Sequence, residues 1–409
     1  MTEEIRTEAL IVGGGMVGLS LGLALAQGGV DVVVLDRESA ERREDDPFDG
    51  RSSAIAHASH RILEGIGIWP SMAGEAQPIL DIRVSDGRVG RAAAPLFLHF
   101  DHHEVGAPFG YIVENRIIRT VLGKAVFDCA NLRHLAPANV SEVQRRSNGV
   151  SLRLADGRRL AAKLLVAADG RESLLRQWAQ IPVLRWSYPQ TGIVATVAHE
   201  LPHEGVAHEH FLPSGPFAML PMTGNRSSIV WTERRDLAAA MMALDAEDFA
   251  AEIERRFGPS LGRIRLVGRR WAYPLEFVHA SRYVDDRLAL IGDAAHAIHP
   301  IAGQGLNLGL RDIAALAEAV VDAARLGLDP GAPEGLRRYQ SWRRFDSLTV
   351  AGLTDALNRL FSNDLPPVRL ARDLGLAAVN RMPPLKRFFM RSAMGALGEL
   401  PRLARGERL

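Results

Sequence analysis

The sequence lacks the features of a secreted, metal-binding or nucleic-acid-binding protein. Cys129 is its single cysteine, so no internal disulfide can form, and no Cys/His cluster has the spacing of zinc ligands. The formal net charge is +1, whereas binding to nucleic-acid phosphates calls for a basic excess. We therefore expect neither a metal site nor a nucleic-acid partner.

Long apolar runs are missing as well. No uninterrupted apolar stretch reaches the ~18 residues that a membrane-spanning helix requires. The first residues include Glu3 and Glu4, and they lack the basic start and the small-residue cleavage site of a signal peptide. The expected location is cytoplasmic.

What the sequence does contain is the pattern of an α/β protein with more than one core, since 409 residues exceed what a single hydrophobic core usually supports. Apolar runs at 9–12 and 30–35 flank glycines and a helical repeat over 19–26, which is the order of a strand–helix–strand unit. Neither run alternates, so both strands are expected in a buried parallel sheet.

Further along, turn residues and apolar spacing predict a strand-rich insertion between two parts of the first domain. We expect an α/β fold, α+β overall, with a discontinuous Rossmann-like domain, a β-sheet substrate domain and a C-terminal helical segment. The predicted elements are a helix over 114–125, hairpins over 140–166, strands at 193–198, 228–231 and 288–291, and helices over 246–257 and 305–324. The expected segments are 1–78, 106–180 and 276–345 for the first domain, 79–105 and 181–275 for the second, and 346–409 for the helical segment.

The first motif is Gly13-Gly14-Gly15-Met16-Val17-Gly18, which fits G-x-G-x-x-G after a strand and at the start of a helix. Gly13 allows the tight turn, Gly15 lets a pyrophosphate approach the backbone, and Gly18 permits close helix–strand packing. Asp36 ends the next strand, where it can accept hydrogen bonds from ribose hydroxyls. This pattern, Val17 included, predicts a dinucleotide site but does not separate NAD from FAD.

Two later motifs narrow the choice. Asp169-Gly170-Arg171-Glu172-Ser173 follows an apolar run, although an Asp-Gly pair alone is a common turn. Gly292-Asp293 follows the strand at 288–291, and the run continues through Pro300 and Gly303-Gln304-Gly305-Leu306-Asn307. A carboxylate such as Asp293 at a strand end can bind ribityl hydroxyls. A glycine-rich turn into a helix aims N–H groups at the pyrimidine edge of a flavin.

On these motifs the sequence resembles the group A flavin monooxygenases related to para-hydroxybenzoate hydroxylase. Within them it is most similar to the ubiquinone-biosynthesis hydroxylases, whose signature His-Pro-x-Ala-Gly-Gln-Gly-x-Asn-x-Gly-x-x-Asp is present from His299 to Asp312. The resemblance covers essentially the whole chain and implies FAD as cofactor. It also implies flavin-binding roles for Arg51 and Arg116, which would otherwise be ordinary surface arginines.

The resemblance further implies a reaction. NADH, NADPH or another donor reduces FAD, O₂ reacts with the reduced flavin, and the C4a-hydroperoxide transfers an oxygen atom to the ring of a polyprenylated phenol. His299 and Pro300 are the candidates at the flavin edge. A catalytic base is not assigned, because His296 and His299 can equally be packing or capping residues.

The last 29 positions, from Arg381 to Leu409, combine a basic excess with apolar residues at helical spacing: Leu385, Phe389, Ala393, Leu397 and Leu400. Such a segment can lie on an anionic membrane surface or pack on its own domain, and the sequence leaves both open. If the segment binds the membrane, we expect a peripheral protein at the inner face of the cytoplasmic membrane. The resemblance also implies other ubiquinone-biosynthesis proteins as partners of this chain.

Competing functions remain at this point. A flavin monooxygenase acting on another phenol, a halogenase or a prenyl reductase would share the glycine and Gly-Asp motifs. The halogenase would need a second tunnel lysine, and the chain has only Lys124, Lys163 and Lys386. An NAD-dependent dehydrogenase would share only the first motif, and a non-catalytic flavin-bound scaffold would share them all.

Overall fold

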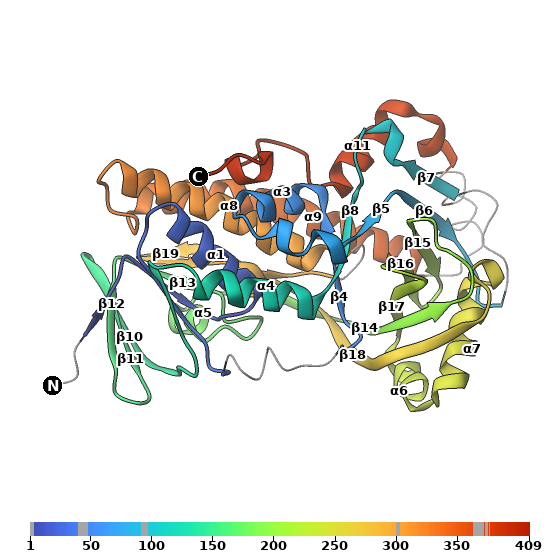
Figure 1. Cartoon of the computed structure of the whole chain (residues 1–409), viewed down its shortest axis with the longest axis horizontal. Coiled ribbons are helices and arrows are strands. Elements are labelled where there is room, and N and C mark those ends of the chain that lie inside the picture. The colour runs from blue at the N-terminus through green and yellow to red at the C-terminus, as the bar shows by residue number, and fades with distance from the viewer. Residues whose placement is uncertain are drawn as a thin grey trace.

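A six-stranded sheet covered by helices lies at one end of the molecule and an eight-stranded sheet at the other (Figure 1). This computed structural model describes residues 4–39, 48–90, 97–299, 303–362, 372, 375 and 377–409. The strands of the first sheet run in the order β19 (Val284–Asp285), β20 (Leu288–Leu290), β13 (Leu164–Ala167), β2 (Ala9–Val12), β3 (Val32–Leu35) and β9 (Leu132–Leu135).

This sheet is parallel from β20 to β9, and β19 is an antiparallel edge strand. Its central strands are apolar without alternation because helices shield the sheet from water. The covering helices are α1 (Met16–Gln27), α3 (His57–Gly65), α4 (Asn115–Phe127), α5 (Leu174–Trp178), α8 (Gln304–Arg325) and α9 (Pro333–Phe361). Every residue of α8 from Asn307 to Val321 is buried, since α1, α3 and α9 contact it.

Two smaller sheets adjoin this part. One has the order β1 (Ile5–Arg6), β12 (Arg159–Ala162), β11 (Gly149–Leu154) and β10 (Val140–Arg146), and it contains the predicted hairpins. The other has the order β4 (Ser52–Ala56), β8 (Gly110–Glu114) and β5 (Gln77–Ile79). Short 3₁₀ turns are η1 (Trp69–Ser71), η2 (Ala73–Glu75), η3 (His102–Glu104), η4 (Pro259–Leu261), η5 (Gly292–Ala294) and η7 (Arg402–Arg405).

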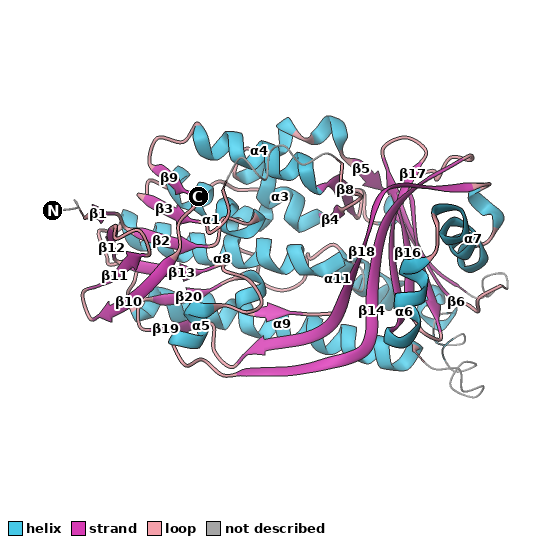
Figure 2. Cartoon of the chain, turned by 90° about the horizontal axis from the view of Figure 1, so that it is seen from below, coloured by secondary structure: helices cyan, strands magenta, loops and turns pink. Residues whose placement is uncertain are grey.

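The eight-stranded sheet draws on separate parts of the chain. Its order is β21 (His296–Ala297), β18 (Ile264–Ala280), β14 (Val183–His199), β17 (Arg226–Arg234), β16 (Gly215–Met222), β15 (Val206–Leu212), β6 (Asp81–Asp86) and β7 (Phe97–Asp101). The long pair β14 and β18 spans the distance between the two ends of the molecule (Figure 2). The expected α/β fold with a discontinuous parallel-sheet part is confirmed.

Helices pack on both faces of the large sheet. On one face, α6 (Arg235–Ala243) and α7 (Ala246–Phe257) contact it, and Phe249 and Ile253 of α7 enter the core. On the other face, α9 and α11 (Pro383–Ala393) contribute Phe361 and Met390 to a second core. One helix, α9, crosses the expected boundary between residue 345 and the C-terminal segment that begins at residue 346. No proline interrupts it after Pro333.

The C-terminal residues do not form the single amphipathic helix that their spacing suggests. Helix α11 ends at Ala393, and Gly395 follows with a φ of +70°, so Leu397 and Leu400 lie beyond it. The tail then packs on α3 and α8, where Leu403 is buried and the Arg402 N–H donates to Glu318 at 2.7 Å. No helix among the described residues is long and apolar enough to cross a bilayer.

Candidate active site

The predicted motifs converge on the edge of the six-stranded sheet at which its parallel strands end. Gly13 follows β2, Asp36 follows β3, Asp169 comes shortly after β13, and Asp293 comes shortly after β20. Because these four strands are parallel neighbours, their following loops lie side by side. We call this place the carboxyl edge; in open α/β sheets it is where ligands bind.

The glycine motif shapes a turn that only glycine can make. Gly13 has a φ of +112°, and a Cβ there would lie 2.1 Å from the carbonyl oxygen of Ala168. A Cβ on Gly18 would lie 1.9 Å from the Gly13 carbonyl oxygen, so helix α1 can start only against a glycine. Val17 packs against Gly292 and Gly309, which joins α1 to the turn after β20 and to α8.

Gly15 differs from these packing glycines. It is the N-cap of α1, and among the described residues no side chain caps the helix and no atom lies within 4 Å of a Cβ added at Gly15. The first N–H groups of α1 therefore face open space, with the positive end of the helix dipole behind them. Such a helix end is suited to a pyrophosphate.

Two acidic residues lie beside this helix end. Asp36 is buried, and its Oδ1 accepts a hydrogen bond from the Glu38 N–H at 3.0 Å. Burial raises the pKa of Asp169, whose Oδ2 accepts from the Leu175 N–H at 3.3 Å. Its Oδ1 is buried without a hydrogen-bond partner among the described residues. A buried acceptor of this kind fits a hydroxyl group of a bound ligand.

The Gly292–Ala294 turn is held from both sides. The buried Asp312 accepts from the Gly292 N–H at 2.9 Å, and the Arg176 guanidinium donates to the Ala294 carbonyl at 2.9 Å. Arg176 also donates to the Arg171 carbonyl at 2.8 Å, so one side chain ties the second motif to the third. Asp293, between these two clamps, is exposed and available to a ligand.

Asp312 lies at the centre of a buried ionic network. It contacts His296 Nε2 at 2.7 Å and Arg343 Nε at 2.8 Å. Burial alone would raise the pKa of Asp312, but His296 and Arg343 outweigh it and lower the pKa. His296 is therefore a structural partner of Asp312, which agrees with the packing role that the sequence left open.

The third motif ends in the start of α8. Gly303 is the N-cap, with a φ of +62°, and a Cβ on Gly305 would meet no atom of the described residues within 4 Å. The Asn307 side chain accepts from Ala56 N–H and donates to Ala54 O, both at 2.8 Å. It thus ties β4 to α8. Leu306 packs against the core of the parallel sheet.

Arg51 and Arg116 lie at one end of the small sheet β4–β8–β5. Arg51 Nε donates to Asp49 at 2.7 Å, and its guanidinium lies 4.4 Å from the centre of the Trp271 ring. Arg116 Nε donates to Glu114 at 2.6 Å and is half exposed. The Asn115 N–H donates to the Arg51 carbonyl at 3.1 Å, which joins the two segments.

Of the two flavin-edge candidates, the structure describes only His299. Pro300 lies outside the described residues. His299 is buried against Tyr188, with 5.2 Å between the ring centres, and burial lowers its pKa to about 4. Neither of its ring nitrogens has a hydrogen-bond partner among the described residues.

An apolar cavity of about 700 Å³ lies between the eight-stranded sheet and the C-terminal helices. Residues of β6, β7 and β15 line one side, and residues of α9 and α11 line the other. Gln304, the first residue of α8, also lines it, so the cavity reaches the helix end at the third motif. Gln304 belongs to the third motif, and no other described residue of the lining stands in one of the three motifs.

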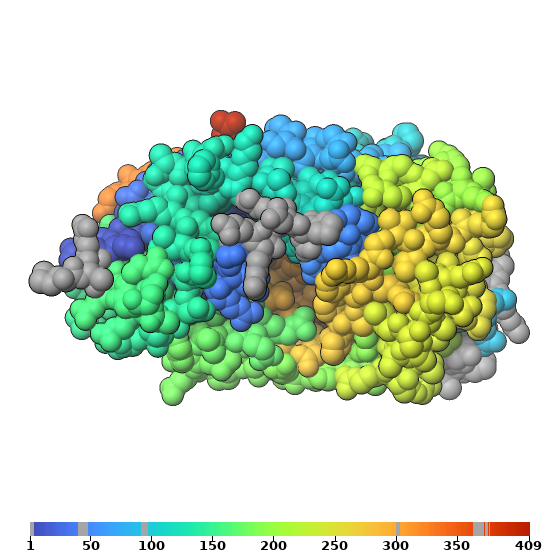
Figure 3. Space-filling model, turned by 60° about the horizontal axis from the view of Figure 1, so that its bottom comes forward, coloured from blue at the N-terminus to red at the C-terminus, as the bar shows by residue number. Residues whose placement is uncertain are grey.

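The described residues fit FAD on geometric grounds. Two uncapped helix ends, the space at Gly15 and Gly305, and the unpaired Oδ1 of Asp169 meet around one edge of the sheet. Figure 3 shows a hollow between the sheet part, in blue and green, and the strand-rich part, in yellow, with orange atoms inside it. Sequence reasoning missed the clamp Arg176 and the buried Arg343, because neither stands in a motif.

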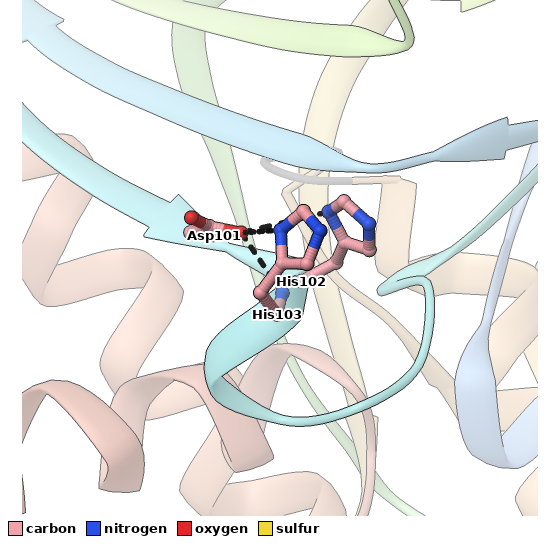
Figure 4. A group of neighbouring side chains, drawn as sticks. All are labelled: Asp101, His102 and His103. Atoms are coloured by element: carbon pink, nitrogen blue, oxygen red, sulfur yellow. Dashed lines mark hydrogen bonds and ion pairs between the residues drawn. The ribbon is translucent and has the colours of Figure 1, made fainter.

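One further cluster could hold a metal ion. Asp101, His102 and His103 place their ligand atoms within 4.8 Å of one another (Figure 4). Asp101 Oδ1, however, accepts from the His103 backbone N–H at 2.8 Å and lies 2.8 Å from its Nδ1. These contacts are those of a helix cap, and we assign no metal to the cluster.

Comparison with known proteins gives both a family and relatives. Residues 6–345 match the FAD binding domain family. The ubiquinone hydroxylase UbiL of Rhodospirillum rubrum is 55% identical over 402 residues, which cover 98% of this chain and 92% of that protein. The 3-demethoxyubiquinol 3-hydroxylase of Escherichia coli is 36% identical over 392 residues, covering 95% and 98%.

A solved structure is similar in fold. The p-nitrophenol 4-monooxygenase PnpA of Pseudomonas putida has a TM-score of 0.81 against this chain at 20% sequence identity. The match covers 97% of this chain and 100% of that one.

Proposed function

The chain belongs to the FAD-dependent ubiquinone hydroxylases, and from that premise we propose that it inserts one oxygen atom of O₂ into the ring of a polyprenylated phenol. Bound FAD, reduced by NADH, NADPH or another donor, supplies the activation of O₂. The protein residues bind and orient the reactants and keep water away.

The observation that carries the proposal is the junction of the apolar cavity with the carboxyl edge at Gln304. A polyprenyl chain needs an apolar space, and the phenol ring must come close to the flavin. A cavity whose lining includes the first residue of α8 meets both requirements.

The cofactor assignment follows the motifs. In this proposal, the N-terminus of α1 with Gly13, Gly15, Val17 and Gly18 holds the pyrophosphate, and Asp36 holds the ribose. Asp169 and Asp293 bind the ribityl side. The start of α8 faces the flavin with Gly303, Gly305, Leu306 and Asn307. Arg51 and Arg116 lie at the border of the flavin site.

A route for the prenyl chain is suggested by the cavity wall. Leu353 and Leu360 of α9 both line the cavity and expose 36% and 45% of their surfaces. Phe388 of α11 is 51% exposed, and the next residue, Phe389, lines the cavity. We propose that this apolar mouth meets the inner face of the cytoplasmic membrane, or other ubiquinone-biosynthesis proteins that deliver the substrate.

The test uses the purified protein with its flavin. Visible absorbance should show bound FAD, and anaerobic titration with NADH and then NADPH should bleach it. After O₂ and a prenylated phenol are added, mass spectrometry should find a product heavier by one oxygen atom. Flavin that is bleached and reoxidised, while every phenol tested is recovered unchanged, would contradict the proposal.

A further inference from the structure

Glu209 places a carboxyl group inside the apolar cavity. It lies on β15, along which side chains alternate between the two faces of the sheet. Its neighbours His208 and His210 face the opposite side, where both contact the Phe257 ring of α7. Phe211, two residues on, lines the cavity together with Glu209.

This carboxyl group has no hydrogen bond or ion pair among the described residues. Only 9% of the Glu209 surface is exposed, and it is the single acidic residue among the described residues that line the cavity. The one cationic residue of that lining, Arg372, forms an ion pair with Asp86 at 2.9 Å. A buried acid without a partner destabilises a fold, so its presence indicates a role in binding or catalysis.

We propose that Glu209 binds the hydroxyl group of the phenol and accepts its proton during hydroxylation, an inference that rests on the proposed function. The phenolic O–H bond breaks, its proton moves to a carboxylate oxygen of Glu209, and the electron pair stays on the phenolic oxygen. That pair raises the electron density at the ring carbon that forms the new C–O bond.

The remaining steps balance the reaction. The ring carbon loses its hydrogen as a proton when aromaticity is restored, and Glu209 returns its proton to the phenolic oxygen. One atom of O₂ ends in the new hydroxyl group and the other in water, and the flavin's electron donor supplies the two electrons that this requires.

The environment of Glu209 suits it to this exchange. Burial raises the pKa of Glu209 to about 8. A phenol has a pKa of about 10, so donor and acceptor differ by roughly two units instead of the roughly six expected for an exposed glutamate. A base whose pKa is close to the working pH is the efficient kind, and Glu209 accepts the phenol proton in its ionised form, whose share grows as the pH approaches 8.

The binding test compares 2-prenylphenol with its methyl ether, 2-prenylanisole, which cannot donate a hydrogen bond. Both are titrated into the FAD-loaded full chain and followed by flavin absorbance. The wild type should bind the phenol at least about tenfold more tightly than the ether, as expected for a hydrogen bond to a carboxyl group. Glu209→Gln should lose most of that preference, and Glu209→Asp should keep part of it.

The proton-transfer test measures product per O₂ consumed with the same phenol. Glu209→Gln should form product about 10²- to 10⁴-fold more slowly, the usual contribution of a general base, while its flavin content stays normal. Glu247→Gln makes the same chemical change at an exposed position of α7 and should match the wild type in both tests.

The outcomes separate the two proposals. If Glu209→Gln keeps the phenol preference and the product rate of the wild type, the role of Glu209 is overturned and the hydroxylase function stands. If the wild type forms no product but its phenol preference depends on Glu209, the hydroxylase function and the proton transfer fall, and the binding role stands.

Discussion

The carboxyl edge and the apolar cavity meet at Gln304, but they are built in different ways. At the edge, glycines, helix ends and backbone N–H groups carry the geometry, and each part lies within a short strand–turn–helix segment. The cavity instead gathers side chains from β6, β7, β15, α9 and α11, which are far apart in the sequence.

The difference teaches where substitutions should act. At the edge, side chains such as Asp312 and Asn307 serve mainly to fix the backbone, so damage there should affect folding and flavin binding together. The side chains that line the cavity are mostly apolar and fix no backbone turn. Substitutions there should therefore change which substrates bind and leave FAD bound.

The largest expected effect is that of Asp312→Ala at the edge. The change leaves His296 buried without its ion-pair partner, removes the buried partner of Arg343, which keeps only Asp346, and frees the Gly292 N–H. We expect the free energy of unfolding to fall by about 3–5 kcal/mol, as for other broken buried ion pairs, and FAD to be lost. Urea unfolding and flavin absorbance measure the two effects.

Asp236→Ala is the control, because it removes the same side chain from an ion pair with Arg234 in which both residues are exposed. It should lower the free energy of unfolding far less, because an exposed ion pair contributes little. Equal losses in the two variants would show that the buried turn has no special role.

Gly15→Val should separate flavin binding from folding. A Cβ at Gly15 meets no atom of the described residues within 4 Å, but a larger side chain there fills the space before the α1 helix end. FAD affinity should fall about 100-fold, equivalent to ~2.7 kcal/mol, while the apoprotein melts as the wild type does. Gly74→Val, at another open and exposed glycine, should leave FAD affinity unchanged.

The geometry of the edge could be predicted from the sequence because its signals are local. The strand before Gly13, the glycine spacing and the acid at Asp36 stand within one βαβ unit, and the other motifs follow strands in the same way. The motifs could not predict which hydrogen-bond partners each of their side chains has. Asn307 ties β4 to α8, a contact between residues about 250 positions apart that no spacing encodes.

The cavity could not be predicted, because side-chain direction in β15 depends on register. The run Val206–Leu212 is buried along nearly its whole length, so its sequence gives no alternation that would assign Glu209 to one face. Only the pairing of β15 with β6 and β16, and the packing of α7 behind it, decide which residues face the cavity.

Ala393→Phe should narrow the cavity without affecting the edge. Ala393 is the last residue of α11 and lines the cavity. The KM for a phenol with a long prenyl chain should rise about tenfold, equivalent to ~1.4 kcal/mol, because the larger side chain occupies part of the apolar space. A phenol with a short chain should be much less affected, and FAD content should not change.

Ala239→Phe on α6 is the control, since Ala239 is exposed on the opposite side of the large sheet. If Ala393→Phe raised the KM for short and long chains equally, the prenyl chain would have to bind elsewhere.

The last prediction concerns Glu209, and over a single pH unit its effect on the free energy of unfolding is no larger than the effect expected of Ala393→Phe. Unlike most substitutions, Glu209→Gln should stabilise the protein. Burial raises its pKa to about 8, so the folded protein holds a proton that the unfolded chain releases above a pKa of about 4.3. Between these two values the contribution of Glu209 to the stability of the wild type should therefore fall as the pH rises, by about 1.4 kcal/mol per pH unit, and should level off above pH 8. Glu209→Gln cannot ionise, so relative to the wild type it should gain stability steadily across this window and be the more stable protein near pH 8. Urea unfolding of both proteins from pH 5 to pH 8.5 measures the difference. If the difference in unfolding free energy between the two proteins stayed constant with pH, Glu209 would have to contact a charged partner or water. The cavity around it would then not be apolar, and its contrast with the carboxyl edge would be lost.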